Sequence, residues 1–120
     1  MATINTMVKI DTASSVAGVL SLDFTNSKQY AVSDVTGDDL SLSAETEIVA
    51  ADYGVTAYVY MVNTSAAAQV KLYDVTVGTE WGVIEPGEWA FFAVPNGRGL
   101  KITPSTGTIT VNYVLMKKLG

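Results

Sequence analysis

Hydrophobic and polar residues alternate along much of this chain with a period of two residues. The most regular run covers residues 108–115, where the apolar positions are Ile109, Val111, Tyr113 and Leu115. A second run covers residues 4–10, where the positions on one face are Ile4, Thr6, Val8 and Ile10. Because alternate side chains of a strand point to opposite faces, both runs predict strands with one buried face.

Shorter strand candidates fill the rest of the chain. Residues 16–24 repeat the alternation, and Tyr30–Val32 and Leu40–Leu42 flank a predicted turn at Thr36-Gly37-Asp38. In the second half, the strand candidates are residues 69–77, 80–84 and 100–102, and the turn signals are Pro86-Gly87, Pro95-Asn96-Gly97 and residues 104–107. Residues 43–53 are open between one helical turn and a short edge strand.

Two segments, Ala57–Val62 and Trp89–Val94, are apolar at almost every position. This composition predicts central strands covered on both faces, or strands that line a subunit contact. Between residues 69 and 77 the apolar positions shift by one residue, which predicts a bulge near Tyr73 or Asp74.

The spacing of these elements predicts the fold class. About eight to ten short strands, with turns every 8–12 residues, are typical of a β-sandwich or barrel. A chain of 120 residues suits one domain with one core. We therefore predict an all-β fold, a single antiparallel β-sandwich over residues 1–120, with the jelly roll as a candidate topology. Residues 1–10 are either an N-terminal arm or the first strand.

The composition removes most catalytic designs. The chain contains no histidine and no cysteine, which excludes a Ser-His-Asp triad, a Cys-His pair and a conventional zinc site. A glycosidase needs two carboxylates that face each other across a cleft, and Glu85 and Glu88 are the candidate pair. They flank the turn at Pro86-Gly87, where side chains normally point into water, so a catalytic pair is disfavoured. We therefore expect no catalytic, cofactor-binding or metal-binding residues, and a protein that is not an enzyme.

The charge distribution bears on partners. A net charge of −5 argues against nucleic-acid binding, which depends on clustered Lys and Arg. Residues 1–53 carry two lysines against eight acidic residues; these acids either steer the chain onto a basic partner or keep it in solution, and the second reading is favoured.

Two further site classes are disfavoured. Residues 34–39 offer several oxygens around Gly37 for Ca²⁺, but they lack the order of an EF-hand loop, so an acidic surface turn is favoured. The N-terminus lacks the features of a secretory signal, and no apolar run is long enough to span a membrane, so we expect no membrane partner.

The candidate binding residues are aromatic or lie on turns. Tyr58 and Tyr60 share one face of a predicted strand and are spaced as a stacking platform for sugars. Trp81 and Trp89 add two indole rings. The alternative for all four is core or subunit contact. Arg98 lies between two glycines, where it either reaches a carboxylate across an interface or is solvated.

The order of segments after residue 57 resembles a known group of proteins. These segments are Val59–Ser65, ending in Asn-Thr-Ser, then Val70-Lys71-Leu72, Ile84–Phe92, Gly99–Ile102 and Gly107–Leu115. In this order they resemble the small β-sandwich virion proteins of tailed bacteriophages, among them capsid decoration (cement) proteins and head-accessory domains. The resemblance covers about half of the chain and rests on hydrophobic pattern and turn residues.

The resemblance implies a non-enzymatic role. Such a protein is made in the host cytoplasm, binds the assembled head lattice at the capsid surface and stabilises it by bridging capsid subunits. The implied partners are the major capsid protein or another virion protein, and further copies of the chain in a dimer or trimer. The alternatives are a tail, fibre or head–tail connecting component, and a carbohydrate- or receptor-binding module. The candidate partner contacts are Ile4, Met7, Val8, Tyr58, Tyr60, Trp81, Trp89 and Arg98.

Overall fold

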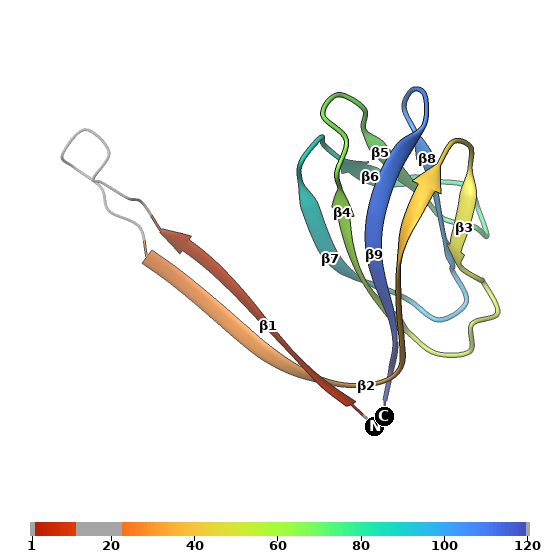
Figure 1. Cartoon of the computed structure of the whole chain (residues 1–120). Coiled ribbons are helices and arrows are strands. Elements are labelled where there is room, and N and C mark those ends of the chain that lie inside the picture. Colours follow the sequence, from red (N-terminus) through yellow and green to blue (C-terminus); the bar gives the residue numbers. More distant parts are fainter. Residues whose placement is uncertain (1, 12–22, 120) are drawn as a thin grey trace.

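A computed structural model describes residues 2–11 and 23–119 of the chain. Within these residues the chain forms nine strands and no helix (Figure 1). The strands are β1 (Ala2–Asp11), β2 (Asp23–Leu42), β3 (Thr46–Val49), β4 (Ala57–Asn63), β5 (Val70–Tyr73), β6 (Glu80–Ile84), β7 (Trp89–Val94), β8 (Leu100–Pro104) and β9 (Ile109–Lys118).

The strands form two antiparallel sheets that pack face to face. One sheet has the order β1-β2-β9-β4-β7, and we call it the arm-bearing sheet because β1 and part of β2 extend from it as an arm. The other sheet, which we call the opposite sheet, has the order β3-β8-β5-β6. From β2 onward, the chain moves between the two sheets so that the order matches that of a jelly roll, an eight-stranded sandwich made of two Greek keys. The predicted all-β antiparallel sandwich is confirmed.

The main core lies between the facing surfaces of the two sheets. The arm-bearing sheet contributes the alternate residues Val59, Met61 and Val111, each 0% exposed, and the opposite sheet contributes Leu100 and Ile102, also 0% exposed. Burial of each such side chain stabilises the fold by roughly 1.5–3 kcal/mol. The period-two pattern of the sequence therefore gives the sandwich a core made by this chain alone.

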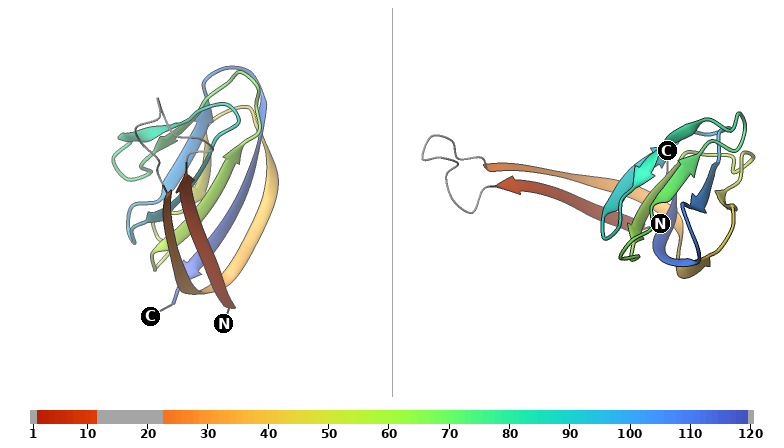
Figure 2. Two further views of the ribbon diagram at one scale, coloured as in Figure 1. Left: turned by 90° about the vertical axis from the view of Figure 1, so that its left-hand side faces the viewer. Right: turned by 90° about the horizontal axis from the view of Figure 1, so that it is seen from above.

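The first half of β2 leaves this sandwich. Residues 23–32 pair with β1, from Asp11↔Asp23 to Ala2↔Val32, whereas residues 32–33 and 36–42 pair with β9. Residues 2–11 and 23–31, which we call the arm, extend away from the sandwich as a two-stranded ribbon (Figures 1 and 2). The Cα radius of gyration is 16.3 Å, against about 13.6 Å for a compact domain of this length. The arm accounts for the excess.

An irregularity in β2 marks the point where the arm meets the sandwich. The register shifts between Ser33 and Thr36, and Asp34 has a φ of 49°, in the left-handed region. The Asp34 carboxylate lies 3.4 Å from the Lys117 ammonium, which also lies 5.0 Å from the centroid of the Tyr53 ring. Burial raises the pKa of the Tyr53 hydroxyl above its ordinary value of 10.0, and the Lys117 charge acts in the opposite direction.

The predicted turn at Thr36-Gly37-Asp38 is wrong, because all three residues lie within β2 and pair with β9. Gly37 lies opposite Val114, and a Cβ at this position would be only 3.1 Å from the Tyr113 carbonyl oxygen. The glycine therefore permits a close approach of two strands instead of a reversal of the chain.

The other strand predictions have mixed outcomes. Residues 43–53 contain an edge strand, β3, and not a helical turn. The bulge predicted near Tyr73 is confirmed by a register shift between Leu72 and Tyr73. Ala57–Val62 lies in β4, a central strand as predicted. Trp89–Val94 forms β7 at an edge of its sheet, so the central strand is wrong for this segment and the alternative, a subunit contact, stays a prediction. Of the candidate at residues 16–24, residues 16–22 lie outside the described residues.

Candidate interaction surface

The outer face of the arm-bearing sheet, turned away from the opposite sheet, gathers aromatic side chains. Strand pairing places Tyr60 beside Phe91 on one side and Val114 on the other, and places Val62 beside Trp89. The base of the arm lies against this face, so that Tyr30 from β2 meets Tyr58 from β4. The aromatic members of this surface, which we call the aromatic face, are Tyr30, Tyr58, Tyr60, Trp89 and Phe91.

Three of these rings form a small second core at the base of the arm. The Tyr30 centroid lies 4.7 Å from that of Tyr58 and 5.5 Å from that of Phe91, and Tyr58 stacks on Phe91 at 6.0 Å. Contacts of this kind add about 0.5–1.5 kcal/mol beyond area burial. Val32 and Met116 are buried in the same cluster. These contacts hold the base of the arm against the sandwich.

Beyond this cluster, the aromatic face stays open and forms a groove of about 580 Å³ between the arm and the sandwich. One wall consists of arm residues, including Ile4 and Met7, and the other includes Tyr60 and Trp89. Met7 is 67% exposed, Trp89 53% and Tyr60 37%. The groove, which we call the aromatic groove, is therefore an apolar surface that the described chain leaves uncovered.

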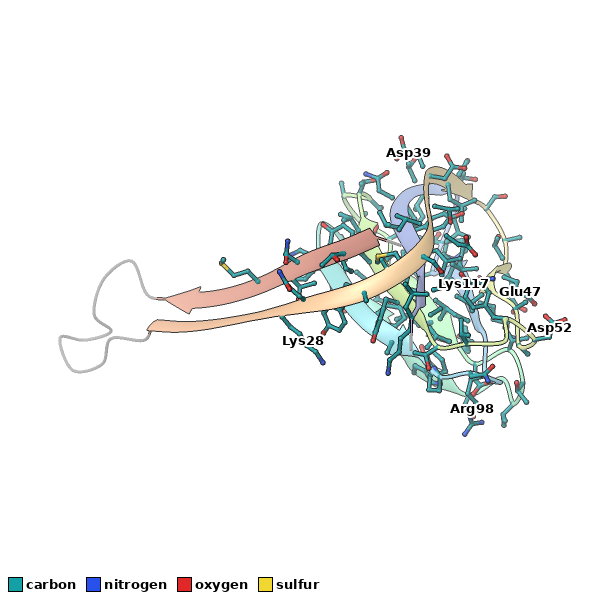
Figure 3. The ribbon with its side chains drawn as sticks, turned by 90° about the horizontal axis from the view of Figure 1, so that it is seen from below. Lys28, Asp39, Glu47, Asp52, Arg98 and Lys117 are labelled. Carbon is teal, nitrogen blue, oxygen red and sulfur yellow. The ribbon has the colours of Figure 1, made fainter. Side chains whose placement is uncertain are left out.

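Opposite charges lie at the two ends of this surface. Lys28 lines the groove from the arm, with its ammonium 4.9 Å from the centroid of the Tyr30 ring. An adjoining hollow shares Tyr60 and Val114 with the groove and is lined by Asp38 and Asp39. Figure 3 shows Lys28 on the arm and Asp39 on the sandwich. The surface thus runs from a positive end, across aromatic rings, to a negative end.

The structure brings four of the candidate contacts together in the groove, namely Ile4, Met7, Tyr60 and Trp89. Tyr58 is only 8% exposed, because it is covered in the small second core. The exposed pair of rings is therefore Tyr60 and Trp89, whose centroids are 6.0 Å apart, and not the predicted platform of Tyr58 and Tyr60. The Val8 side chain lies outside the described residues.

Two candidates lie elsewhere. Trp81 is on β6 in the opposite sheet and is 39% exposed. The Arg98 guanidinium lies 3.3 Å from the carboxylate of Asp74, whose side chain is 4% exposed. Asp74 also accepts hydrogen bonds from the backbone N–H groups of Thr76, at 2.7 Å, and Val77, at 3.2 Å. Arg98 thus has a carboxylate partner within its own chain, where it helps to hold a turn.

Among the groove residues that the sequence interpretation did not identify are Lys28, Tyr30 and Phe91. The signal for the first two was present, because Lys28, Tyr30 and Val32 alternate on one strand face. Reading the segment as the short strand Tyr30–Val32 hid this alternation. Phe91 was hidden among apolar neighbours on both faces of β7.

Among the side chains that the structure describes, no group of three or more acidic residues is placed to hold a metal ion. The segment considered for Ca²⁺ is part of strand β2, with Asp34 paired to Lys117. In the described part of the chain no helix is long and apolar enough to cross a membrane.

No protein-family model matches the chain, and no curated protein matches it. A solved structure of Bacillus endospore appendages, described as a novel family of disulfide-linked pili, is similar in outline, with 16% sequence identity and a TM-score of 0.49. The match covers 78% of this chain and 93% of that chain. A similarity this low carries no statement about function.

Proposed function

We propose that this chain is a non-enzymatic structural subunit of a bacteriophage virion, a decoration protein that binds the assembled head and bridges capsid subunits. The observation that carries the proposal is the arm, a two-stranded ribbon that projects from a sandwich whose core is already complete. The virion setting comes from the resemblance in residues 57–116.

The arm is suited to binding a neighbouring subunit. In the described residues, β1 pairs only with β2, and residues 23–30 of β2 pair only with β1. A two-stranded ribbon is marginally stable in water by itself. Its outer edges present unpaired N–H and C=O groups, to which another strand can be added. A neighbour that pairs with or covers the arm would supply the missing support.

Bridging follows from the division of the chain into two parts. If the sandwich rests on one capsid subunit and the arm reaches a neighbour that rests on the next, each bound copy opposes separation of the two. Because the chain would bind the assembled lattice and not free subunits, its binding free energy would add to the stability of the shell.

Co-sedimentation with capsids tests this proposal. Purified chain is mixed with expanded empty heads of the phage that encodes it, prepared without this protein, and the heads are pelleted. We expect saturation at a fixed ratio to the major capsid protein and a rise in the temperature at which the heads disrupt. Absence of binding to these heads would contradict the decoration role.

A matched pair of variants tests the part played by the arm. Met7, on the arm, and Val77, in the turn before β6, are 67% and 66% exposed. Met7→Asp should weaken binding to heads by about 10-fold or more, because it places a charge on the contact. Val77→Asp should bind as the parent does. Equal binding by both variants would remove the arm from the contact.

A carbohydrate- or receptor-binding module is the second candidate, because Tyr60 and Trp89 form an exposed aromatic pair in a groove of suitable volume. Titration with a panel of glycans would then quench Trp89 fluorescence to saturation. Images of the intact virion separate the remaining alternatives, since density for the chain on a tail or fibre would assign it there.

A further inference from the structure

The aromatic groove presents a self-complementary order of charges. Lys28 lies at its arm end, Tyr60 and Trp89 in the middle, and Asp38 and Asp39 in the adjoining hollow. Any partner that covers this surface must carry the reverse order, with acids opposite Lys28 and a cation opposite the two aspartates. A second copy of the same surface, turned around, carries that order.

The shape of the groove points to the same partner. One wall is the arm itself, and the other ends at β7, which is the edge of its sheet in the described chain. An extended ribbon with an apolar side chain facing inward fits between two such walls. Within the described residues, the arm is an element of this kind, and Met7 is an exposed apolar side chain on it.

We infer that a second copy of this chain covers the aromatic groove, with the arm of each copy lying in the groove of another. The reciprocal pair is the smallest such assembly. In it, each copy gives and receives the same contact, so Lys28 of one copy lies beside Asp39 of the other and the reverse contact is also made. Met7, Tyr60 and Trp89 become buried, and the arm gains the support it lacks alone. This inference goes beyond the virion role and does not depend on it.

Charge reversal tests the inference on the full chain. Sedimentation over a concentration series should give a defined oligomer for the parent. Lys28→Asp and Asp39→Lys should each weaken association by about 10-fold or more, because each brings like charges together. The double variant restores opposite charges at every contact and should recover association to within about 3-fold of the parent.

Cross-linking tests the geometry. Because the sequence contains no cysteine, an introduced cysteine is the only thiol in each variant. A mixture of Lys28→Cys and Asp39→Cys proteins should form a disulfide-linked heterodimer on mild oxidation. Lys28→Cys mixed with Asp52→Cys is the matched control, because Asp52 lies away from both groove ends (Figure 3). The control mixture should remain unlinked.

Tryptophan emission measures the burial of Trp89 on association. It uses variants that keep Lys28 and Asp39, so it stands even if a charge variant folds poorly. Trp81→Phe leaves Trp89 as the one indole, and its emission should move to shorter wavelength as the protein concentration rises. Trp89→Phe leaves Trp81, on the opposite sheet, and its emission should stay constant.

Three results would overturn the inference: a monomer at every concentration, an oligomer in which the control pair links as readily as the test pair, or saturable glycan quenching of Trp89 in a monomer. Capsid binding is a separate outcome. If the chain self-associates through the groove but fails to bind heads, this inference stands and the proposed function is contradicted. If the chain binds heads as a monomer, the proposed function stands and this inference is contradicted.

Discussion

The two faces of the arm-bearing sheet differ in what covers them, although both are built from large apolar side chains. On the inner face, Val59, Met61 and Val111 are fully buried against the opposite sheet. On the outer face, Tyr60 and Trp89 remain 37% and 53% exposed beside the arm. The inner face is completed by the same chain. The outer face is completed only at the base of the arm.

Apolar character and burial are therefore separate properties of the side chains in this sandwich. The inner face obtains its partner from strands that follow in sequence, so its burial is part of folding. The outer face has an aromatic cluster at the base of the arm and then an open groove, which the described part of the chain leaves exposed. Substitutions in the two regions should therefore affect different measurements.

The largest expected contrast is between a core leucine and the arm methionine. Leu100→Ala should lower the free energy of unfolding by about 2–5 kcal/mol, because it leaves a cavity between the sheets. Met7→Ala should change it by less than about 0.5 kcal/mol, since Met7 is 67% exposed. Urea unfolding at low protein concentration measures both. A comparable loss for Met7→Ala would mean that the arm belongs to the cooperative fold of the monomer.

A second contrast compares two asparagines. Asn63 is 0% exposed; its amide donates to the carbonyl oxygens of Ala68, at 2.8 Å, and Ile84, at 3.0 Å, and its side-chain oxygen accepts from the N–H of Ser65, at 2.9 Å. Asn63→Ala should cost about 1–3 kcal/mol, because it leaves buried backbone groups without partners.

Asn5 is the control for Asn63, because it is exposed on the arm. Asn5→Ala should leave the free energy of unfolding unchanged within about 0.5 kcal/mol. If Asn63→Ala also left the free energy of unfolding unchanged in urea, water would be replacing the lost hydrogen bonds. The site would then be less enclosed than its burial indicates.

The smallest effect is expected where the two regions join. Asp34 has a φ of 49°, and its ion pair with Lys117 is largely exposed. Asp34→Val should cost about 1–2 kcal/mol, because a β-branched residue is strained in the left-handed region. Asp34→Gly relieves that strain and loses only an exposed ion pair, so a change below about 1 kcal/mol is expected.

Hydrogen exchange then shows where the Asp34 substitutions act. Asp34→Val should raise exchange in residues 2–11 more than in β9, because the strain lies at the base of the arm. A uniform rise over both regions would place Asp34 in the sandwich instead of at a junction.

The sequence predicts the sandwich well because its signal is local. The alternation in residues 108–115 specifies which side chains of β9 face the core, and the shift near Tyr73 marks the bulge. Gly37 shows the limit. A glycine in an acidic segment reads as a turn, and only the pairing with β9 reveals a close approach of two strands.

The groove could not be predicted because it depends on long-range contacts. Tyr30 and Phe91 lie far apart in the sequence and meet because β2 bends at its bulge and brings the arm over β7. The apolar run of β7 indicates burial on both faces but does not tell a central strand from an edge strand under an arm. The candidates Met7, Tyr60 and Trp89 were identified individually, and their common surface was not.

The strand order also has a consequence for how the protein is made. β9 lies between β2 and β4, yet it is synthesised after all the other described strands. Until it emerges from the ribosome, β2 and β4 have no strand to join them, and the aromatic face has neither its Val114 nor its Met116. Pairing of such distant segments slows folding and prolongs exposure of apolar surface. The nascent chain therefore completes the arm-bearing sheet only once its last described strand has been synthesised.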